Sequence, residues 1–244
     1  MRNDVDKRRI GLILPSVNIR LEPELYRCPQ LSPFNFYSTR VMLDDTTEDA
    51  LQAMELDLKH AANMLATVFP EVVLYACTSG SFIGGANGNA HIMETIAEAC
   101  GCPVVTASQA MVDAIKEVRA KRVTLVTPYT DDINAREKDF LTAHGIQVVA
   151  MQGLQIVPAE ELRTKSAEDI KELVLKTDVP DSDAVFISCT NVEGFQICEA
   201  LEQTLGKPVL TSNVACIWSM LRAIRHDVVI DTHGTLLREH LHKD

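Results

Sequence analysis

Short apolar runs alternate with longer amphipathic stretches along the chain. Four runs are almost entirely apolar, at 10–14, 72–75, 123–127 and 184–188. Four more runs with strand character lie at 36–41, 103–106, 147–151 and 208–211. Apolar residues recur at helical spacing at 47–68, 90–99, 108–119, 132–144, 166–175 and 193–205. All-apolar strands are typical of parallel sheets covered by helices on both faces, so the pattern predicts an open parallel α/β fold.

The chain also repeats itself. Residues 9–16 align with 122–129 at an offset of 113, 73–78 with 185–190 at 112, and 101–106 with 206–211 at 105. Three collinear matches at nearly one offset indicate a duplication. We therefore expect two pseudo-symmetric lobes, each a four-stranded parallel sheet flanked by helices, with the active site in the cleft between them. The first lobe is predicted to comprise 1–112 plus 214–244, and the second 113–213.

Composition and net charge limit the kinds of partner that the protein can bind. The 244 residues include 23 basic and 34 acidic side chains, giving a net charge of −11. This balance argues against nucleic acid or an anionic membrane as a partner, since both need a basic face, but it permits a small anionic substrate. No signal peptide or membrane-spanning run is visible, and seven cysteines are an odd number. We expect a cytoplasmic protein with free thiols.

Two cysteines occupy equivalent places in the repeats. Cys77 and Cys189 each follow a buried strand and precede a threonine. Ligands of open α/β sheets bind at the carboxyl ends of strands, so facing lobes would bring both thiols to one cleft. We expect the turn amides to lower the pKa of each thiol toward or below neutrality, and a helix to open at Asn191. The alternative is two buried core cysteines.

Polar side chains gather near the same strand ends. Amide and phenol groups there can bind a substrate carboxylate without a cation, although such residues also cap turns and helices. The predicted catalytic residues are Cys77 and Cys189. The predicted substrate-binding residues are Ser16, Asn18, Thr78, Ser79, Tyr129, Thr190 and Asn191.

We expect neither an organic cofactor nor a metal ion. The glycine-rich stretch at 80–88 lacks both the dinucleotide and the P-loop spacing. Cys100 and Cys102 form a Cys-Gly-Cys sequence without matched ligands elsewhere.

Several of these motifs resemble the aspartate/glutamate racemase superfamily. Within it, they are most similar to the branch of maleate cis–trans isomerases and arylmalonate decarboxylases, closest to the isomerases. The similarity spans roughly residues 9–225. It rests on Pro15-Ser-Val-Asn18, Glu22-Pro-Glu24, Tyr75-Ala-Cys-Thr-Ser-Gly-Ser-Phe-Ile-Gly84, Thr127-Pro-Tyr129 and Ser188-Cys-Thr-Asn191.

The paired cysteines distinguish the members of this branch. Arylmalonate decarboxylases keep only the second-half cysteine, so the presence of both Cys77 and Cys189 fits isomerases and racemases better. Two departures stand out. Val17 replaces the serine usual in the isomerase motif, and no asparagine occupies the stretch at the strand end around 157–160, where the resemblance implies one. Part of their carboxylate clamp is therefore missing or replaced.

The resemblance implies a mechanism without a cofactor. The Cys77 thiolate would attack a cis-dicarboxylate such as maleate, and Cys189 would move the proton. Tyr129, Asn18 and the turn amides would stabilise the developing charge. Racemisation of an amino acid or hydantoin, or decarboxylation of a malonate, stays open on the same scaffold, as does non-catalytic carboxylate binding. We also expect a homo-oligomer, a dimer or a tetramer.

Overall fold

The structure is a computed structural model that describes residues 7–226 and 228–241. It contains two four-stranded sheets, with strand orders β2-β1-β3-β4 and β6-β5-β7-β8. Every strand pairing within them is parallel. The strands of the first sheet are β1 (Arg8–Pro15), β2 (Phe34–Val41), β3 (Val72–Tyr75) and β4 (Val104–Thr106). Those of the second are β5 (Arg122–Thr127), β6 (Gln147–Gly153), β7 (Ala184–Ile187) and β8 (Val209–Thr211).

The eight predicted strands are confirmed, and so is the fold class. The same strand order in both sheets is what a duplicated unit produces. The all-apolar runs form the inner strands, and β3 and β7 are buried along their whole length. The edge strands β2 and β6 are partly exposed and carry more polar residues. Burial on both faces therefore explains the hydrophobic pattern from which the fold was predicted.

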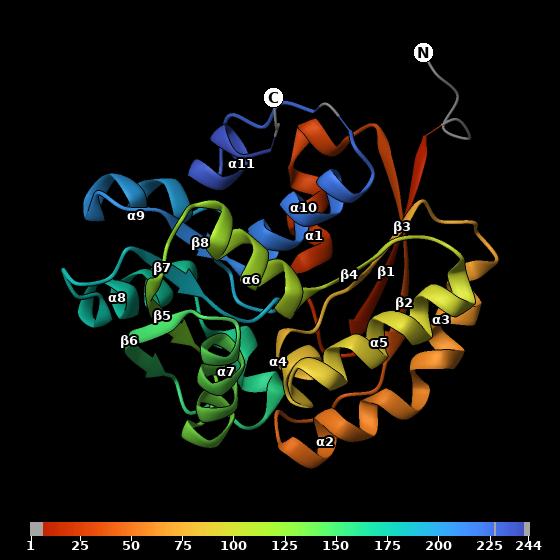
Figure 1. The fold of residues 1–244 in the computed structure, drawn as a ribbon, viewed down its shortest axis with the longest axis horizontal. Coiled ribbons are helices and arrows are strands. Elements are labelled where there is room, and N and C mark those ends of the chain that lie inside the picture. Colours follow the sequence, from red (N-terminus) through yellow and green to blue (C-terminus); the bar gives the residue numbers. More distant parts are fainter. Residues whose placement is uncertain (1–6, 227, 242–244) are drawn as a thin grey trace.

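Helices cover both sheets (Figure 1). In the first half of the chain they are α1 (Leu21–Arg27), α2 (Glu48–Ala53), α3 (Leu58–Ala66), α4 (Thr78–Phe82), α5 (Gly85–Cys100) and α6 (Ala107–Glu117). In the second half they are α7 (Asp131–Ala143), α8 (Ala167–Thr177), α9 (Cys198–Leu205), α10 (Ser212–Ala223) and α11 (Thr235–Glu239). Short 3₁₀ helices are η2 (Pro29–Leu31), η3 (Met54–Asp57) and η4 (Ala159–Thr164).

Two predicted helices differ from the observed ones. The stretch 47–68 is split into α2, η3 and α3. The tighter 3₁₀ turn keeps Met54 buried, where its methyl group packs against Gly80. The predicted helix 193–205 begins only at Cys198, because residues 190–197 form turns and the Phe195 N–H donates to Glu24 instead of to a helical carbonyl.

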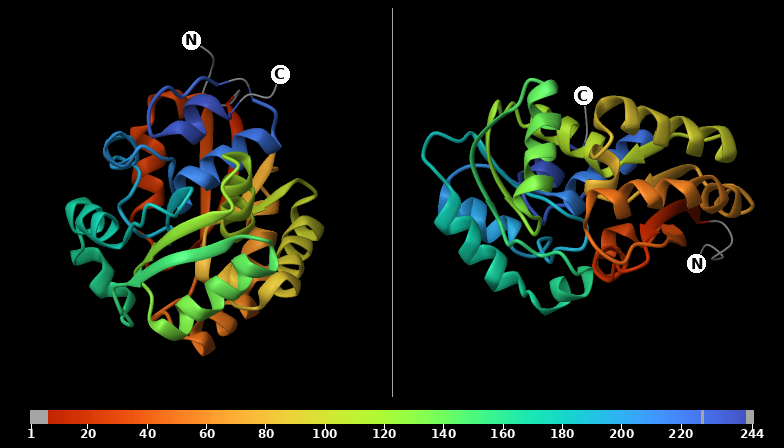
Figure 2. Two further views of the ribbon diagram at one scale, coloured as in Figure 1. Left: turned by 60° about the vertical axis from the view of Figure 1, so that its left-hand side comes forward. Right: turned by 90° about the horizontal axis from the view of Figure 1, so that it is seen from below.

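Helices α6 and α10 join the two halves. They pack against each other at the centre of the molecule, and α10 also contacts β3 and β4 of one sheet and β8 of the other (Figures 1 and 2). The larger hydrophobic cluster runs through both sheets, since it includes Leu12 and Phe186, and a second cluster contains Val126 and Ile187 of the second sheet. Within 7–226 and 228–241, no helix is long and apolar enough to cross a membrane.

Candidate active site

A small cavity lies at the carboxyl ends of both sheets. Residues at or after the ends of β1, β2 and β3 form one side, and residues after β5, β6 and β7 form the other. It leaves about 40 Å³ for the centres of water-sized molecules. The lining residues are Pro15, Val17, Asn18, Leu43, Thr46, Cys77, Thr78, Ser79, Pro128, Tyr129, Ile156, Leu162, Cys189, Thr190 and Asn191. The cavity thus lies where ligands bind in open α/β sheets.

Cys77 lies at the N-terminus of α4. Its sulfur accepts a hydrogen bond from the Gly80 backbone N–H (3.3 Å), and the Ser79 hydroxyl is 3.9 Å away. The side chain is 3% exposed. Burial raises the pKa of the Cys77 thiol to about 11, against the lowering effect of Gly80 and Ser79.

Cys189 faces the same cavity from the second sheet. It has a φ of 87°, a left-handed conformation that is strained for a residue with a side chain and that recurs at functional sites. Its sulfur accepts a hydrogen bond from the Asn191 backbone N–H (3.4 Å). Burial raises the pKa of the Cys189 thiol to about 12, and the charges of Cys77 and Glu137 add to that rise.

Two expectations about these turns are wrong. Both thiols have raised pKa values, because burial outweighs the single amide that each sulfur accepts from. No helix opens at Asn191: the Cys77 turn leads into α4, whereas the Cys189 turn continues as irregular chain to Cys198. The pseudo-symmetric thiols therefore have different backbone surroundings.

Side chains around the cavity bond the two halves together. Thr190 donates a hydrogen bond from its hydroxyl to the Ala76 carbonyl (2.8 Å) and accepts one from the Asn18 amide (3.0 Å). The Asn191 amide donates to the Val17 carbonyl (3.2 Å), and its carbonyl accepts from the Ile19 N–H (2.9 Å). These bonds use one N–H of each amide and leave a second N–H on each.

Tyr129 supplies a free donor. Its ring is 2% exposed and packs edge-on against Phe82. Its hydroxyl lies beside the Cys189 sulfur and lowers the pKa of that thiol, but the geometry falls short of a full hydrogen bond. No other partner in the described part of the chain binds the hydroxyl. A buried hydroxyl without a partner at a cavity wall is suited to bind a ligand oxygen.

Thr78 and Ser79 are the first residues of α4. Their backbone N–H groups have no preceding helical turn to bond to, which leaves them available to an anion in the cavity. The Thr78 hydroxyl is already used, since it donates to Ser212 (3.0 Å). Thr78 therefore offers its backbone, rather than its side chain, to the cavity.

One predicted site residue lies elsewhere. The Ser16 hydroxyl donates to the Leu43 carbonyl (3.2 Å) and accepts from the Leu43 N–H (3.0 Å), and Ser16 is absent from the cavity lining. It fixes the end of β1 to the loop after β2. The other predicted residues, Cys77, Cys189, Asn18, Thr78, Ser79, Tyr129, Thr190 and Asn191, come together around the cavity.

The sequence reasoning missed the apolar walls. The repeat offset of 113 relates Pro15 to Pro128 and Leu43 to Ile156, and all four line the cavity. Applying the offset to apolar as well as polar residues would have found them. The loops that carry Leu43 and Ile156 also join, because the Thr46 N–H donates to the Val157 carbonyl (3.1 Å).

Comparison with known proteins places this geometry in a family. A sequence profile of the arylmalonate decarboxylase family matches residues 10–237, most of the chain. The chain belongs to this family. The expected resemblance to the branch of maleate isomerases and arylmalonate decarboxylases is thereby confirmed.

Individual relatives agree with that placement. A maleate isomerase of Nocardia farcinica is 29% identical over 241 residues, which cover 95% of this chain and 96% of the relative. An arylmalonate decarboxylase of Bordetella bronchiseptica is 27% identical over 212 residues, covering 86% and 85%. The chain is therefore an enzyme of this family, an isomerase or else a decarboxylase.

A solved structure shares the fold nearly throughout. It is a cysteine-to-serine variant of the Nocardia farcinica maleate cis–trans isomerase with a covalently bound succinylcysteine intermediate. The TM-score is 0.90 at 28% identity, covering 95% of this chain and 98% of that chain.

Proposed function

We propose that the protein is a cofactor-independent cis–trans isomerase of a small unsaturated dicarboxylate, converting maleate to fumarate through a covalent adduct on Cys77. The observation that carries the proposal is that two thiols, Cys77 and Cys189, face one buried cavity from opposite sheets. A carbon atom held between them can accept a nucleophile from one side and a proton from the other. The succinylcysteine in the related isomerase supports the same chemistry here.

The reaction begins with Cys77 as thiolate and Cys189 as thiol. The Cys77 sulfur forms a bond to one alkene carbon, and the π electrons move to the other carbon and its carboxylate. Cys189 then protonates that carbon, which gives a succinyl adduct with a single central bond. After rotation about this bond, the Cys189 thiolate takes a proton back and the carbon–sulfur bond breaks, releasing the trans product.

Several donors support the charge that develops on the carboxylate. The Tyr129 hydroxyl lacks a partner among the described residues, and the Thr78 and Ser79 N–H groups begin a helix. The second N–H of the Asn18 amide is also available at the cavity wall. Fixed donors of this kind stabilise an oxyanion most strongly where water is excluded.

A second candidate is decarboxylation of a malonate. It is favoured by the apolar wall of Leu43, Ile156 and Leu162, which suits a large apolar substituent and has no hydrogen-bond donor of its own. Loss of CO₂ would leave an electron pair on the carbon and its remaining carboxylate, and Cys189 would protonate that carbon. The decarboxylase among the relatives supports this alternative.

A proton-NMR time course separates the two. Purified protein is incubated with maleate and, separately, with phenylmalonate, alongside Cys77→Ala and Cys189→Ala variants. Fumarate that forms with the unaltered protein and disappears with Cys77→Ala is the expected result. Phenylacetate formation that survives Cys77→Ala but not Cys189→Ala, with maleate unchanged, would replace isomerisation by decarboxylation.

A further inference from the structure

A carboxyl group that the proposed reaction does not use is buried behind Cys189. Glu137 lies on α7 and is 0% exposed. One carboxyl oxygen accepts a hydrogen bond from the Ser188 hydroxyl (2.6 Å), and the other has no partner in the described part of the chain. Ser188 directly precedes Cys189, so this bond ties α7 to the segment that carries the thiol.

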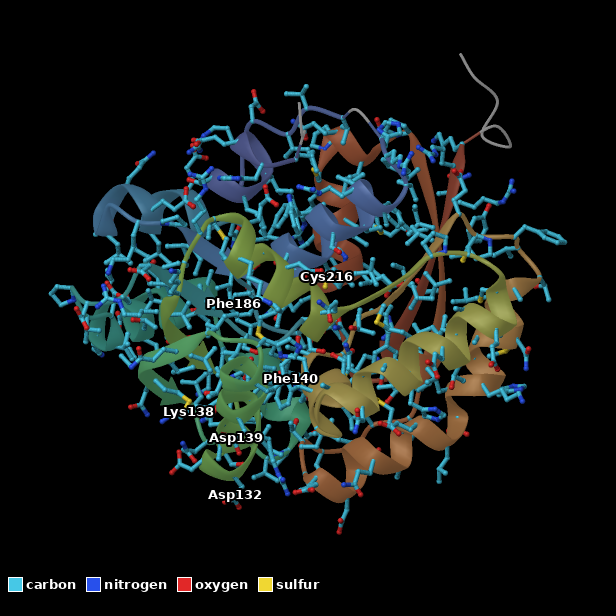
Figure 3. The ribbon with its side chains drawn as sticks, in the orientation of Figure 1. Asp132, Lys138, Asp139, Phe140, Phe186 and Cys216 are labelled. Carbon is cyan, nitrogen blue, oxygen red and sulfur yellow. The ribbon has the colours of Figure 1, made fainter. Side chains whose placement is uncertain are left out.

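Glu137 stands out on its own helix. The buried face of α7 consists of Ile133, Asn134, Glu137, Phe140 and Leu141. Figure 3 shows Phe140 on the inner side of this helix, and the side chains of Asp132, Lys138 and Asp139 are exposed. A carboxyl in the middle of a buried face, with no cation bonded to it in the part of the chain that the structure describes, is costly to the fold. Such a group is more readily explained by the reaction than by stability.

The charges around the two thiols are not symmetric. Glu24 lies at the position related to Glu137 by the offset of 113, and it too is buried. Its carboxylate accepts from the Phe195 N–H (3.4 Å) and from the Asn213 amide (2.5 Å), and Asn213 also donates to the Thr190 carbonyl (3.2 Å). Glu137 therefore bonds the residue before Cys189, whereas Glu24 bonds the chain farther along, at Phe195. The Cys77 thiol is hydrogen-bonded by the uncharged Gly80 N–H, with the Ser79 hydroxyl nearby, and among the described residues the titratable groups around it are Tyr75, Tyr129 and Cys189 rather than a carboxyl.

We propose that Glu137 is a positioning residue whose carboxylate holds Cys189 in its thiol form as the pH rises above neutrality, so that Cys189 remains the proton carrier and Cys77 the nucleophile. The role as proton carrier rests on the proposed isomerase or decarboxylase function. The coupling between Glu137 and Cys189 does not, and it can be measured without turnover.

The physical basis is electrostatic. The titratable groups that face the Cys189 thiol are Tyr129, Cys77 and Glu137, and those that Glu137 faces are Cys189 and Tyr129. Burial raises the pKa of Glu137 to about 8, so it loses its proton before either thiol does. Above about pH 8 the resulting negative charge, in a buried site, makes ionisation of Cys189 harder, whereas at neutral pH burial alone keeps this thiol protonated. A thiol with a high pKa stores its proton at neutral pH and, once ionised, is basic enough to take it back from carbon.

The test is the rate at which Cys189 is alkylated. Cys77→Ala is made first, so that one pocket thiol remains, and Glu137→Gln is added to it. Glutamine keeps an acceptor for Ser188 but carries no charge. Iodoacetamide labelling is followed at pH 7 to 10 by peptide mass spectrometry. Cys100 and Cys102 are partly exposed, so their labelling in the same sample is an internal reference for the reagent concentration and for the pH.

We expect Glu137→Gln to speed labelling of Cys189 about 3- to 10-fold at pH 9, equivalent to a pKa lower by about 0.5 to 1. Asp139→Asn, on the outer face of the same helix, should leave the rate unchanged. Equal rates with and without Glu137→Gln, or the same acceleration by Asp139→Asn, would overturn the proposal.

A second variant covers the case in which Glu137→Gln folds poorly, as judged by its melting curve. Glu137→Met removes the carboxyl and fills the space with an apolar chain, which is often tolerated at buried charged sites. It should also speed labelling of Cys189. Because labelling needs no substrate, this result is independent of whether maleate or a malonate is turned over.

Discussion

The side-chain amide of Asn18 donates a 3.0 Å hydrogen bond to the hydroxyl of Thr190, 172 residues away in the chain. Asn18 follows the first strand of one sheet, and Thr190 follows the third strand of the other. The Thr190 hydroxyl in turn donates a hydrogen bond to the backbone carbonyl of Ala76, the residue that directly precedes Cys77. One short chain of hydrogen bonds therefore fixes both cysteine turns relative to each other.

Asn18→Ala should loosen this junction. The Asn18 carbonyl oxygen also accepts from the Arg20 and Leu21 N–H groups (both 3.1 Å), so three hydrogen bonds are lost. We expect the free energy of unfolding to fall by about 1–3 kcal/mol and turnover to fall with it. Urea denaturation and the NMR assay measure the two effects. Asn87→Ala, at an exposed position on α5, is the matched control. If both variants lose the same stability, the junction does not hold the two halves together.

Gly80→Ala should displace the nucleophile. A Cβ at Gly80 would lie 2.5 Å from the Met54 methyl, 2.9 Å from the Tyr75 hydroxyl and 3.0 Å from the Cys77 sulfur. Neighbours must move, and a small shift of a reacting atom lowers turnover by on the order of 10- to 100-fold.

Gly88→Ala is the control for this substitution. A Cβ there meets nothing within 4 Å, and the residue lies inside α5. This variant should keep its activity and gain up to about 1 kcal/mol of stability, since alanine favours a helix over glycine. A fully active Gly80→Ala would mean that the Cys77 position tolerates the added atom.

The sequence predicts the fold wherever the hydrophobic pattern of a segment shows directly which of its faces are buried. All-apolar runs such as 72–75 and 184–188 can be little other than inner strands, and the structure has them as β3 and β7. Helix α1 was missed because it is short and contains Pro23. Helix 193–205 was predicted too long because Phe195 gives its N–H to Glu24, a tertiary contact that no local pattern encodes.

Two rules predicted the site: ligands bind at the carboxyl ends of parallel strands, and equivalent positions of the two repeats face one cleft. Those two rules brought Asn18, Tyr129 and both cysteines to one cavity. They could not give the pKa values, because the loss of water around each thiol depends on how the two halves close. Glu137 was hidden for a related reason, since a charged residue in an amphipathic helix is expected on the outer face.

Stability should fall as the pH rises from about 5 to 8. The pKa of Glu137 is raised from 4.5 to about 8 and that of Glu24 to about 7, both by burial. In this window the unfolded chain has released these protons while the folded chain keeps them, so each pH unit costs the fold up to about 1.4 kcal/mol per group.

Glu137→Gln isolates one of these groups. The contribution of Glu24 is the same in both proteins and cancels in the difference. Chemical denaturation at pH 5, 6, 7 and 8 should show a shallower loss of stability for Glu137→Gln than for the unaltered protein. Parallel curves would mean that Glu137 titrates normally in the folded state.

The apolar wall leads to a prediction about specificity. Leu162 is buried, lines the cavity and lies in η4, just after the stretch where an asparagine was expected and is missing. Leu162→Asn would give a second substrate carboxylate a donor. A hydrogen bond to a charged group contributes about 1.5–3 kcal/mol, so we expect KM for maleate to fall by about 10-fold or more.

Leu162→Ala is the control, because it enlarges the cavity without adding a donor and should not lower KM for maleate. Phenylmalonate should respond in the opposite direction, because Leu162→Asn places a polar group against its ring. If Leu162→Ala and Leu162→Asn lower KM for maleate equally, space rather than hydrogen bonding limits its binding.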